Sequence, residues 1–587
     1  MRWEDAAPRE VLARIVSYVR PHRGLVAAAF LTAVGSQGLA LTVPVLVGLA
    51  IDAVVGPGQV AWGDLAWLMG RLACVVAAVA LLQWLQGYTT SRLTYETVRD
   101  LRDAAYGKFR RLPVSYIDGH PHGDLMSRVV NDADAVGDGL LQGVQQLFCG
   151  VVAVVGTLAF MFWISPAMAV VVVVVTPVSV LVAAFIAKVG HTSFAAQQEI
   201  QGDLGGYVEE HVSNQRLLWA FGRAEEAEEG FAALNDRLYT VGERAQFAGS
   251  LTNPGTRFAN NVVYAVVAAI GCWACLTGFP GPLSIGGVQS FLSYTTQYTK
   301  PFNDISGVMT QLQTAFASAR RLFSLIDAPE MGPDPADALV LPEEPAGEMG
   351  FSDVSFGYGP GRPLLEGITW HAHPGERVAV VGPTGCGKTT LINLLLRFYD
   401  ADSGTIEVDG CDTRALTRAS LRRAFGMVLQ DTWLFEGTVA ENIAYGRPDA
   451  TREEVRAAAE RAFAADFIER MPEGYDTVVG EGGAGLSQGQ RQLLCIARVM
   501  LVDPPILLLD EATSSIDTRT EALVQEAFDA MMAGRTSLVV AHRLSTVRSA
   551  DQILVMGHGT IVERGTHEEL LALGGEYAEL YRSQFEG

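Results

Sequence analysis

Positive charge is scarce in this sequence. Its 43 lysine and arginine residues are outnumbered by 65 aspartate and glutamate residues, which gives a formal net charge of −22 at pH 7. A nucleic-acid-binding protein neutralises phosphates with clustered basic side chains. The composition therefore excludes this class, and we expect no nucleic-acid partner.

Cysteine is also rare, with seven residues scattered over 587 positions. They form no framework of the kind that staples small secreted domains, which favours a reducing compartment or a membrane. Cys272 and Cys275 form a CxxC inside an apolar stretch. We interpret them as small membrane residues rather than as a redox pair.

Charge of either sign is missing from several long stretches of the N-terminal half. Since a membrane span needs about 20 apolar residues, these stretches predict six membrane helices. The expected spans are about 24–51, 64–91, 139–164, 167–187, 258–278 and 285–310.

Lysine and arginine gather on one side of these spans. Arg14, Arg20 and Arg23 precede the first span, and the long connections 92–138 and 188–257 carry many charges with helical periodicity. The opposite loops, near 53–63, 165–166 and 278–284, contain neither lysine nor arginine. The positive-inside rule therefore predicts that both termini lie in the cytoplasm. We expect an integral membrane protein of a bacterial-type plasma membrane.

The composition changes after the last expected span. Residues 327–347 are rich in proline and acid and indicate a linker. In 348–587, short β-like runs alternate with helical segments, which predicts an α/β domain with a mostly parallel sheet. The fold class is thus multidomain: an all-α six-helix transmembrane domain over 1–326 is followed by an α/β domain, for which the motif GPTGCGKT (382–389) predicts a P-loop ATPase domain.

The α/β part contains a phosphate-binding loop. GPTGCGKT (382–389) fits G-x-x-x-x-G-K-[ST], follows the apolar run RVAVV and precedes the helical TLINLLLRF. Backbone N–H groups of such a loop surround phosphates, and the helix N-terminus adds its dipole. The residues expected to hold ATP here are Gly382, Pro383, Thr384, Gly385, Cys386, Gly387, Lys388, Thr389 and Thr390.

Within this loop, Lys388 is expected to contact the β- and γ-phosphates, and the Thr389 hydroxyl to ligate Mg²⁺. Cys386 has two interpretations that stay open. A helix N-terminus favours a reactive thiolate, which would make the loop sensitive to alkylation. The alternative is a small residue that only fills space.

Polar residues that end other apolar runs would supply the remaining chemistry. ILLLDEATSS (506–515) presents Asp510 for Mg²⁺ and Glu511 for polarising an attacking water. His542 ends TSLVVAH and is expected to sense the γ-phosphate, while Gln430 could reach both Mg²⁺ and the water. Tyr358, upstream of the loop, could stack on adenine, or it is a sheet residue.

These motifs, in this order, resemble the nucleotide-binding domain of ABC transporters, and the front half resembles the exporter-type membrane domain. The resemblance covers almost the whole chain and identifies Tyr358 as the A-loop aromatic and Gln430 as the Q-loop residue. It also implies an X-loop at 480–485, the signature LSQGQ at 486–490 and a D-loop at 514–517.

The resemblance implies a dimer of half-transporters, in which each ATP lies between the phosphate loop of one chain and the signature of the other. Ser487 and Gln490 have the spacing of a capping box at a helix start. Ser487, Gly489 and Gln490, with that helix N-terminus, are then expected to contact the partner's ATP. Coupling to the membrane helices is expected near 114–124 and 211–225.

Gln488 departs from the common LSGGQ signature. LSQGQRQLL, with NPGTRFANNVVYAVVA and LQDTWLFEGTVAENI, resembles the catalytically competent subunit of heterodimeric bacterial multidrug exporters. This favours an asymmetric pair of half-transporters, and the alternative is a homodimer that tolerates glutamine there.

The resemblance implies ATP-driven export of amphipathic small molecules, drugs, lipids or peptides. Import on the same fold, as by siderophore carriers of this type, and an ATP-gated channel or sensor are the alternatives. The polar or aromatic positions of the last two spans could line a substrate cavity or make helix–helix contacts. These positions are Asn260, Asn261, Tyr264, Gln289, Tyr294, Gln297 and Tyr298.

Overall fold

The computed structural model describes residues 3, 6–54, 60–279, 281, 283–359, 361–429, 432–510, 518–541 and 544–585. The chain forms two compact units. The first comprises Met1–Arg111 and Pro121–Pro329, and the second comprises Leu112–His120 and Glu330–Gly587. A short segment from the membrane half therefore belongs to the C-terminal unit.

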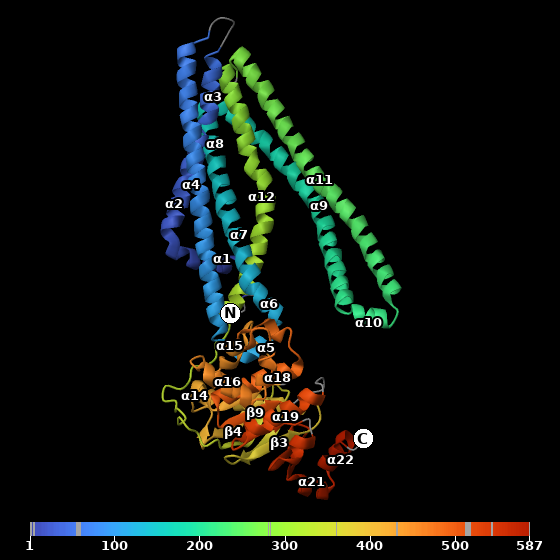
Figure 1. Ribbon diagram of the computed structural model, residues 1–587. Coiled ribbons are helices and arrows are strands. Elements are labelled where there is room, and N and C mark those ends of the chain that lie inside the picture. The colour runs from blue at the N-terminus through green and yellow to red at the C-terminus, as the bar shows by residue number, and fades with distance from the viewer. Residues whose placement is uncertain are drawn as a thin grey trace. The chain divides into compact units, whose positions relative to one another are not determined.

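The first unit is helical, as the sequence predicts (Figure 1). Its helical elements are α1 (Pro8–Val19), η2 (Arg20–His22), α2 (Arg23–Ala40), α3 (Val43–Asp52), α4 (Trp62–Phe109), α6 (His122–Ser127), η3 (Arg128–Asp132), α7 (Ala133–Gln142), η4 (Gly143–Phe148), α8 (Cys149–Ile164), α9 (Pro166–Ser213), α10 (Gln215–Ala220), α11 (Ala224–Thr277) and α12 (Ile285–Ile326).

Three helical stretches of the described chain are long and apolar enough to cross a membrane, namely Pro8–Asp52, Trp62–Phe109 and Arg257–Thr277. Two shorter apolar helices, Cys149–Ile164 and Pro166–Pro177, overlap the third and fourth expected spans in part. The sixth expected span lies within α12. The total of six spans stays a prediction.

The expected first span is divided into two helices at Leu41 and Thr42. Pro44, in the first turn of α3, has no N–H to donate to the carbonyl four residues earlier, so the helix cannot continue through it. The Tyr294 hydroxyl of α12 donates a hydrogen bond to the Leu41 carbonyl at this break. Tyr294 is fully buried and thus makes a helix–helix contact.

The longest helices extend well past a membrane thickness. α9 has 48 residues and α11 has 54, and at about 1.5 Å per residue each exceeds the roughly 30 Å hydrocarbon layer more than twofold. The two helices pack side by side and are joined by α10 (Figure 1). The charged periodic segment 188–257 is therefore helical, as predicted.

The second unit combines strands and helices. Its strands are β1 (Met349–Phe356), β2 (Leu365–Ala372), β3 (Arg377–Val381), β4 (Ser403–Val408), β5 (Cys411–Asp412), β6 (Phe425–Val428), β7 (Gly437–Thr438), β8 (Val478–Val479), β9 (Ile506–Asp510), β10 (Thr536–Val540), β11 (Gln552–Gly557) and β12 (Thr560–Gly565). Its helical elements are α5 (Val114–Asp118), α13 (Lys388–Leu395), α14 (Arg418–Arg423), α15 (Val439–Ala444), α16 (Arg452–Arg461), α17 (Ala465–Ile468), η5 (Gly474–Asp476), η6 (Glu481–Gly483), α18 (Gln488–Val502), α19 (Thr518–Met532), α20 (Leu544–Arg548), α21 (His567–Leu573) and α22 (Glu576–Phe585).

The main sheet has six strands in the order β12-β11-β3-β10-β9-β6. All neighbours are parallel except β12, which is antiparallel to β11. This confirms the mostly parallel sheet that the sequence predicts. A second sheet, in the order β2-β1-β4-β5, is antiparallel and was not anticipated.

The central strands are buried on both faces, and alternate residues enter two different cores. On β9, Leu507 and Leu509 pack in one core, while Ile506 and Leu508 pack in the other. Successive strand residues point to opposite faces, so these cores lie on opposite sides of the sheet. α18 packs into the first core, whereas α13 and the antiparallel sheet pack into the second.

Candidate nucleotide-binding and hydrolysis site

The predicted phosphate loop has the required strand–loop–helix context. β3 ends at Val381, and α13 begins at Lys388. Gly387 is the N-cap of α13 with φ +100°, and a Cβ there would lie 2.5 Å from Leu365 Cδ2. Only glycine fits this conformation and this space, which is why the loop can turn tightly into the helix.

Lys388 folds back over the loop that precedes it. Its Nζ donates hydrogen bonds to the carbonyls of Gly382 at 2.8 Å and Pro383 at 2.9 Å, and the side chain is only 9% exposed. A buried ammonium needs such acceptors, because desolvation otherwise disfavours the charge. The amine is thus held at the loop, within reach of phosphates that the loop would bind.

Cys386 is buried in the same loop. It is 6% exposed, its Sγ lies 4.0 Å from Lys388 Nζ, and a Cβ on Gly382 would approach it to 3.0 Å. A tightly surrounded thiol favours the interpretation of Cys386 as a space-filling residue over that of a reactive one.

The two residues expected at the metal site are brought together. Thr389, in the first turn of α13, donates a hydrogen bond from Oγ1 to Asp510 Oδ2 at 3.1 Å. Asp510 ends β9 and is 9% exposed. A hydroxyl and a carboxylate are the oxygen ligands that Mg²⁺ prefers, so this pair fits the ion that the sequence implies.

Tyr358 lies just beyond the end of β1 and reaches the phosphate-loop helix. Its hydroxyl is 3.1 Å from Thr390 Oγ1, and Asn393 Nδ2 donates to it at 3.4 Å. The ring is 53% exposed and packs edge-on against Phe356 and Tyr399. An exposed aromatic beside this helix is available for stacking, which favours the A-loop interpretation over that of a sheet residue.

Gln430, Glu511 and His542, together with the D-loop 514–517, lie outside the described residues. The strands that precede the three residues are β6, β9 and β10, which are parallel neighbours in the same sheet as β3. Their roles stay predictions from the sequence.

The signature segment starts a helix with the predicted capping box. Ser487 is the N-cap of α18, where its backbone N–H donates to Gln490 Oε1 at 2.9 Å and Gln490 N–H donates to Ser487 Oγ at 3.3 Å. Gly489 is buried, and Gln488 is half-buried in the first turn. Helix N-terminal N–H groups attract anions, so the capped turn is a suitable phosphate contact.

The phosphate loop and the signature belong to helices on opposite faces of one sheet. Lys388 and Thr389 open α13, which packs on the face shared with the antiparallel sheet. Ser487 caps α18, which packs on the other face. The phosphate loop and the signature therefore form two separate half-sites. Each half-site would be completed by the matching half-site of a second subunit.

The segment Leu112–His120, which contains α5, packs with the nucleotide unit. The Tyr399 hydroxyl donates a hydrogen bond to Asp118 Oδ2 at 2.6 Å. Burial raises the pKa of Tyr399, and its hydrogen bond to the Asp118 carboxylate raises that pKa further, so the phenol stays a donor. Tyr399 also contacts Tyr358, which links this connection to the nucleotide site. Sequence reasoning missed this pair, which lies 281 residues apart.

A cavity of about 580 Å³ lies in the membrane unit. It is lined from α1, α2, α4, α7, η4, α8 and α12, and among the residues that the structure describes the lining is apolar. None of the seven polar or aromatic positions proposed from the sequence lines it. Leu12, Ile15 and Val19 of α1 line it, and their apolar recurrence at helical spacing is the sequence signal that could have indicated this wall.

A phosphate-loop ATPase joined in one chain to an apolar helical unit defines an ATP-driven membrane transporter. Comparisons agree. Residues 26–302 match the ABC transporter transmembrane region, and residues 365–514 match the ABC transporter family model.

Curated relatives match over nearly the full length. The uncharacterized ABC transporter ATP-binding protein YfiC of Bacillus subtilis (strain 168) is 41% identical, covering 98% of this chain and 94% of its own. The fatty acid ABC transporter ATP-binding/permease protein of Mycobacterium tuberculosis (strain CDC 1551 / Oshkosh) is 42% identical, covering 90% and 83%. The ATP-dependent lipid A-core flippase of Syntrophus aciditrophicus (strain SB) is 34% identical, covering 100% and 96%.

The fold also matches a solved structure of a bacterial Atm1-family ABC exporter with ATP bound. The TM-score is 0.74 at 29% identity, covering 96% of this chain and 98% of that one. This chain therefore belongs to the ABC transporter family. It is an integral membrane protein with a cytoplasmic ATPase domain that couples ATP hydrolysis to export, and half-transporters of this kind act as dimers.

Proposed function

We propose that this chain exports an amphipathic, lipid-like molecule, and that it is the catalytically competent half of an asymmetric pair. The observation that carries the substrate class is the apolar cavity of about 580 Å³ in the membrane unit. A cavity of this size can take up an acyl chain or a comparable apolar group.

The chemistry rests on positioning and charge neutralisation. Lys388 and the loop N–H groups hold the β- and γ-phosphates, and Thr389, Asp510 and Gln430 are the residues that would hold Mg²⁺. Mg²⁺ bound there neutralises charge that develops on the phosphates.

Two residues that follow strands of the main sheet in the sequence are assigned to the attacking water and the γ-phosphate. Glu511 accepts a hydrogen bond from the water and orients it, and His542 donates to the γ-phosphate. Tyr358 stacks on the adenine. Ser487, Gly489 and Gln490 contact the γ-phosphate of the ATP held by the second subunit, so ATP bridges the two chains.

Relatives support a lipid-like substrate and the export direction. One relative is named a fatty acid transporter, another a lipid A-core flippase, and the structural neighbour an exporter. Import, the alternative direction on this fold, has no such support among them.

The substrate proposal is tested by filling the cavity from its rim. Val151 lines the cavity and is 62% exposed, so Val151→Trp can occupy the cavity without displacing packed core residues. Val155, one turn further along α8, is also 62% exposed and does not line the cavity, which makes Val155→Trp the matched control. We expect stimulation of ATPase activity by medium- and long-chain fatty acids in nanodiscs to be lost in Val151→Trp and kept in Val155→Trp. Equal stimulation in both variants would exclude the cavity as the substrate site.

The asymmetric pair rests on Gln488, which falls on the motif that contacts only the second subunit's ATP. The proposal predicts that this chain, expressed alone, gives no dimer with ATPase activity and gains it when a half-transporter lacking the catalytic glutamate is co-expressed. Size-exclusion chromatography with light scattering and an ATPase assay measure both properties. A stable, ATP-hydrolysing dimer of this chain alone would favour the homodimer instead.

A further inference from the structure

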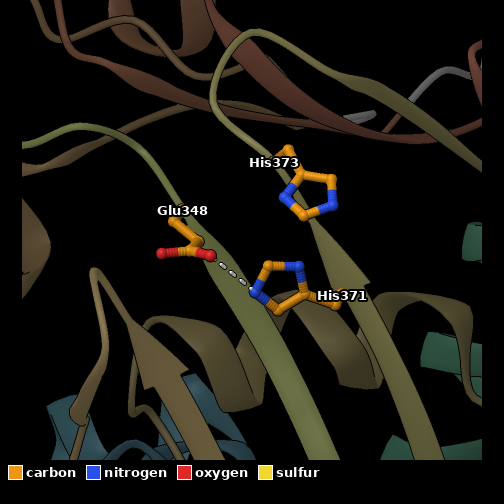
Figure 2. Close-up of side chains that lie close together, drawn as sticks. All are labelled: Glu348, His371 and His373. Carbon is orange, nitrogen blue, oxygen red and sulfur yellow. Dashed lines mark ion pairs between the residues drawn. The ribbon is translucent and has the colours of Figure 1, made fainter.

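Three side chains that can ligate a metal gather on the four-stranded antiparallel sheet, outside the nucleotide site. Glu348 immediately precedes β1, His371 lies in β2 and His373 follows its end. One ligand atom from each residue lies within 4.8 Å of the other two. Figure 2 shows the two imidazoles and the carboxylate close together, with the ion pair between Glu348 and His371 as a dashed line.

The strand register explains why these residues meet. Met349 is paired with Ala372 and Gly350 with His371, so Glu348 comes opposite His373 in the continuation of the ladder. Residues two apart on a strand point to the same face, which puts His371 and His373 together. Their ring centroids are 4.9 Å apart, and His371 Nε2 is 2.9 Å from Glu348 Oε1.

Gly350 makes room for this arrangement. A Cβ at this position would lie 2.9 Å from His371 Cδ2. The backbone of Gly350 does not have positive φ, so space rather than conformation accounts for the glycine. A glycine within a strand weakens it and often marks a close approach, here of the His371 imidazole over β1.

Hydrogen bonds fix the backbone on both sides of the three-residue cluster. Glu348 N–H donates to Asp409 Oδ1 at 2.8 Å, and Asp409 N–H donates to the Glu348 carbonyl at 2.9 Å. Just beyond the end of β2, His373 N–H donates to Glu376 Oε2 at 2.8 Å. Because the backbone is fixed, rotation of the side chains is enough to bring the three metal-ligating atoms together.

We propose that Glu348, His371 and His373 bind a Zn²⁺ ion through two imidazole nitrogens and one carboxylate oxygen. Zn²⁺ takes these ligands at about 2.0–2.2 Å in tetrahedral geometry, which sets the ligand atoms roughly 3.3–3.6 Å apart. His371 is 47% exposed and Glu348 39% exposed, so modest rotations close the remaining gap. Ca²⁺ and Mg²⁺ are excluded by their preference for oxygen ligands.

An exposed His–Glu ion pair without a metal is the simpler interpretation of the contact between Glu348 and His371. Such a pair contributes little to stability, and it gives no role to His373 or to the space left by Gly350. A three-donor site with a water in the fourth position uses all of these features.

The three-residue cluster lies at the start of the nucleotide-binding domain, where a bound ion would restrict the motion of the backbone. Glu348 is the first residue after the expected linker 327–347. His373 is followed, four residues later, by Arg377 at the start of β3, the strand that leads into the phosphate loop. Bound Zn²⁺ therefore cross-links the start of β1 to the connection between β2 and β3.

The test is metal binding by the full-length protein in detergent, purified through an affinity tag without histidine and stripped with a chelator. Zn²⁺ is titrated by isothermal calorimetry, and Co²⁺ is added separately to read the ligand type by visible absorption. The variants are His371→Ala/His373→Ala and Glu348→Gln. The control is His558→Asn, an exposed histidine with φ +51° that lies outside the cluster.

We expect one Zn²⁺ site per chain that survives His558→Asn. The double histidine variant should weaken it by roughly 100-fold and Glu348→Gln by roughly 10-fold, because ligand loss costs at least as much as loss of an outer partner. The Co²⁺ spectrum should show d–d bands of a nitrogen and oxygen site. Zn²⁺ affinity that is unchanged in the double variant, or a thiolate charge-transfer band that persists in it, would overturn the proposal. Unchanged circular dichroism of each variant excludes misfolding as the cause.

Discussion

Lys388→Ala is expected to abolish ATP hydrolysis and to weaken ATP binding. The Lys388 amine is held at the phosphate loop by two backbone carbonyls and is nearly buried. Its loss removes a positive charge from a site of low dielectric, where it stabilises phosphate charge far better than it would in water. It also leaves the carbonyls of Gly382 and Pro383 without this donor.

We expect ATPase activity to fall by about 10²–10³-fold, the range for removal of one preorganised charge-stabilising donor. Lys388→Arg should not restore it, since the planar guanidinium does not fit the space of a compact ammonium. ATPase assays and binding of a fluorescent ATP analogue, in nanodiscs with the second subunit present, measure both losses. Arg470→Ala, at an exposed position of the same unit, is the control. Activity of Lys388→Ala within twofold of the parent would remove Lys388 from the site.

Glu511→Gln is expected to stop turnover while ATP binding survives. Glutamine has nearly the same shape as glutamate but cannot accept the proton of an attacking water. General-base contributions of this kind are about 10²–10⁴-fold. Asp510, the preceding residue in the sequence, and its hydrogen-bond partner Thr389 stay intact, so we expect nucleotide binding to be kept.

The measurement pairs a steady-state ATPase assay with trapping of radiolabelled ATP on the purified complex. The expected result is trapped ATP with no released phosphate. Since Lys388→Ala loses binding as well, the two variants separate nucleotide capture from hydrolysis. Normal phosphate release by Glu511→Gln would assign the base to another residue.

The local patterns were enough to predict the phosphate loop, the capped signature helix and the mostly parallel main sheet of the nucleotide half. The phosphate loop, the capping box of Ser487 and Gln490, and the apolar strand that ends in Asp510 all depend on residues close in sequence. Short-range turn chemistry and apolar periodicity therefore carried the prediction.

What was missed depends on contacts between distant residues. The antiparallel sheet pairs β1 with β4, so that Met349 faces Val408, and no local pattern reveals such a pairing. The same holds for the Asp118–Tyr399 hydrogen bond, which brings a segment of the membrane half into the nucleotide unit.

In the membrane half, prediction from the sequence was limited by what hydropathy can show. Hydropathy locates apolar stretches but not their breaks, and the first stretch is divided between Ala40 and Val43, just before Pro44. The sequence allows Tyr294 to line a cavity or to contact another helix. In the structure its hydroxyl donates a hydrogen bond to the Leu41 carbonyl, so it makes a helix–helix contact. The cavity is instead lined by apolar side chains, which carry no distinguishing pattern in a membrane segment.

The central claim is that ATP hydrolysis at this chain's site drives a lipid-like molecule out of the cytoplasm. The most direct test is uptake of a labelled fatty acid into inside-out vesicles that contain the chain and its second subunit, with and without ATP. The account predicts ATP-dependent accumulation that disappears in Glu511→Gln and in Val151→Trp but persists in Val155→Trp. Accumulation that is independent of ATP, or that is undiminished by Glu511→Gln, would contradict it.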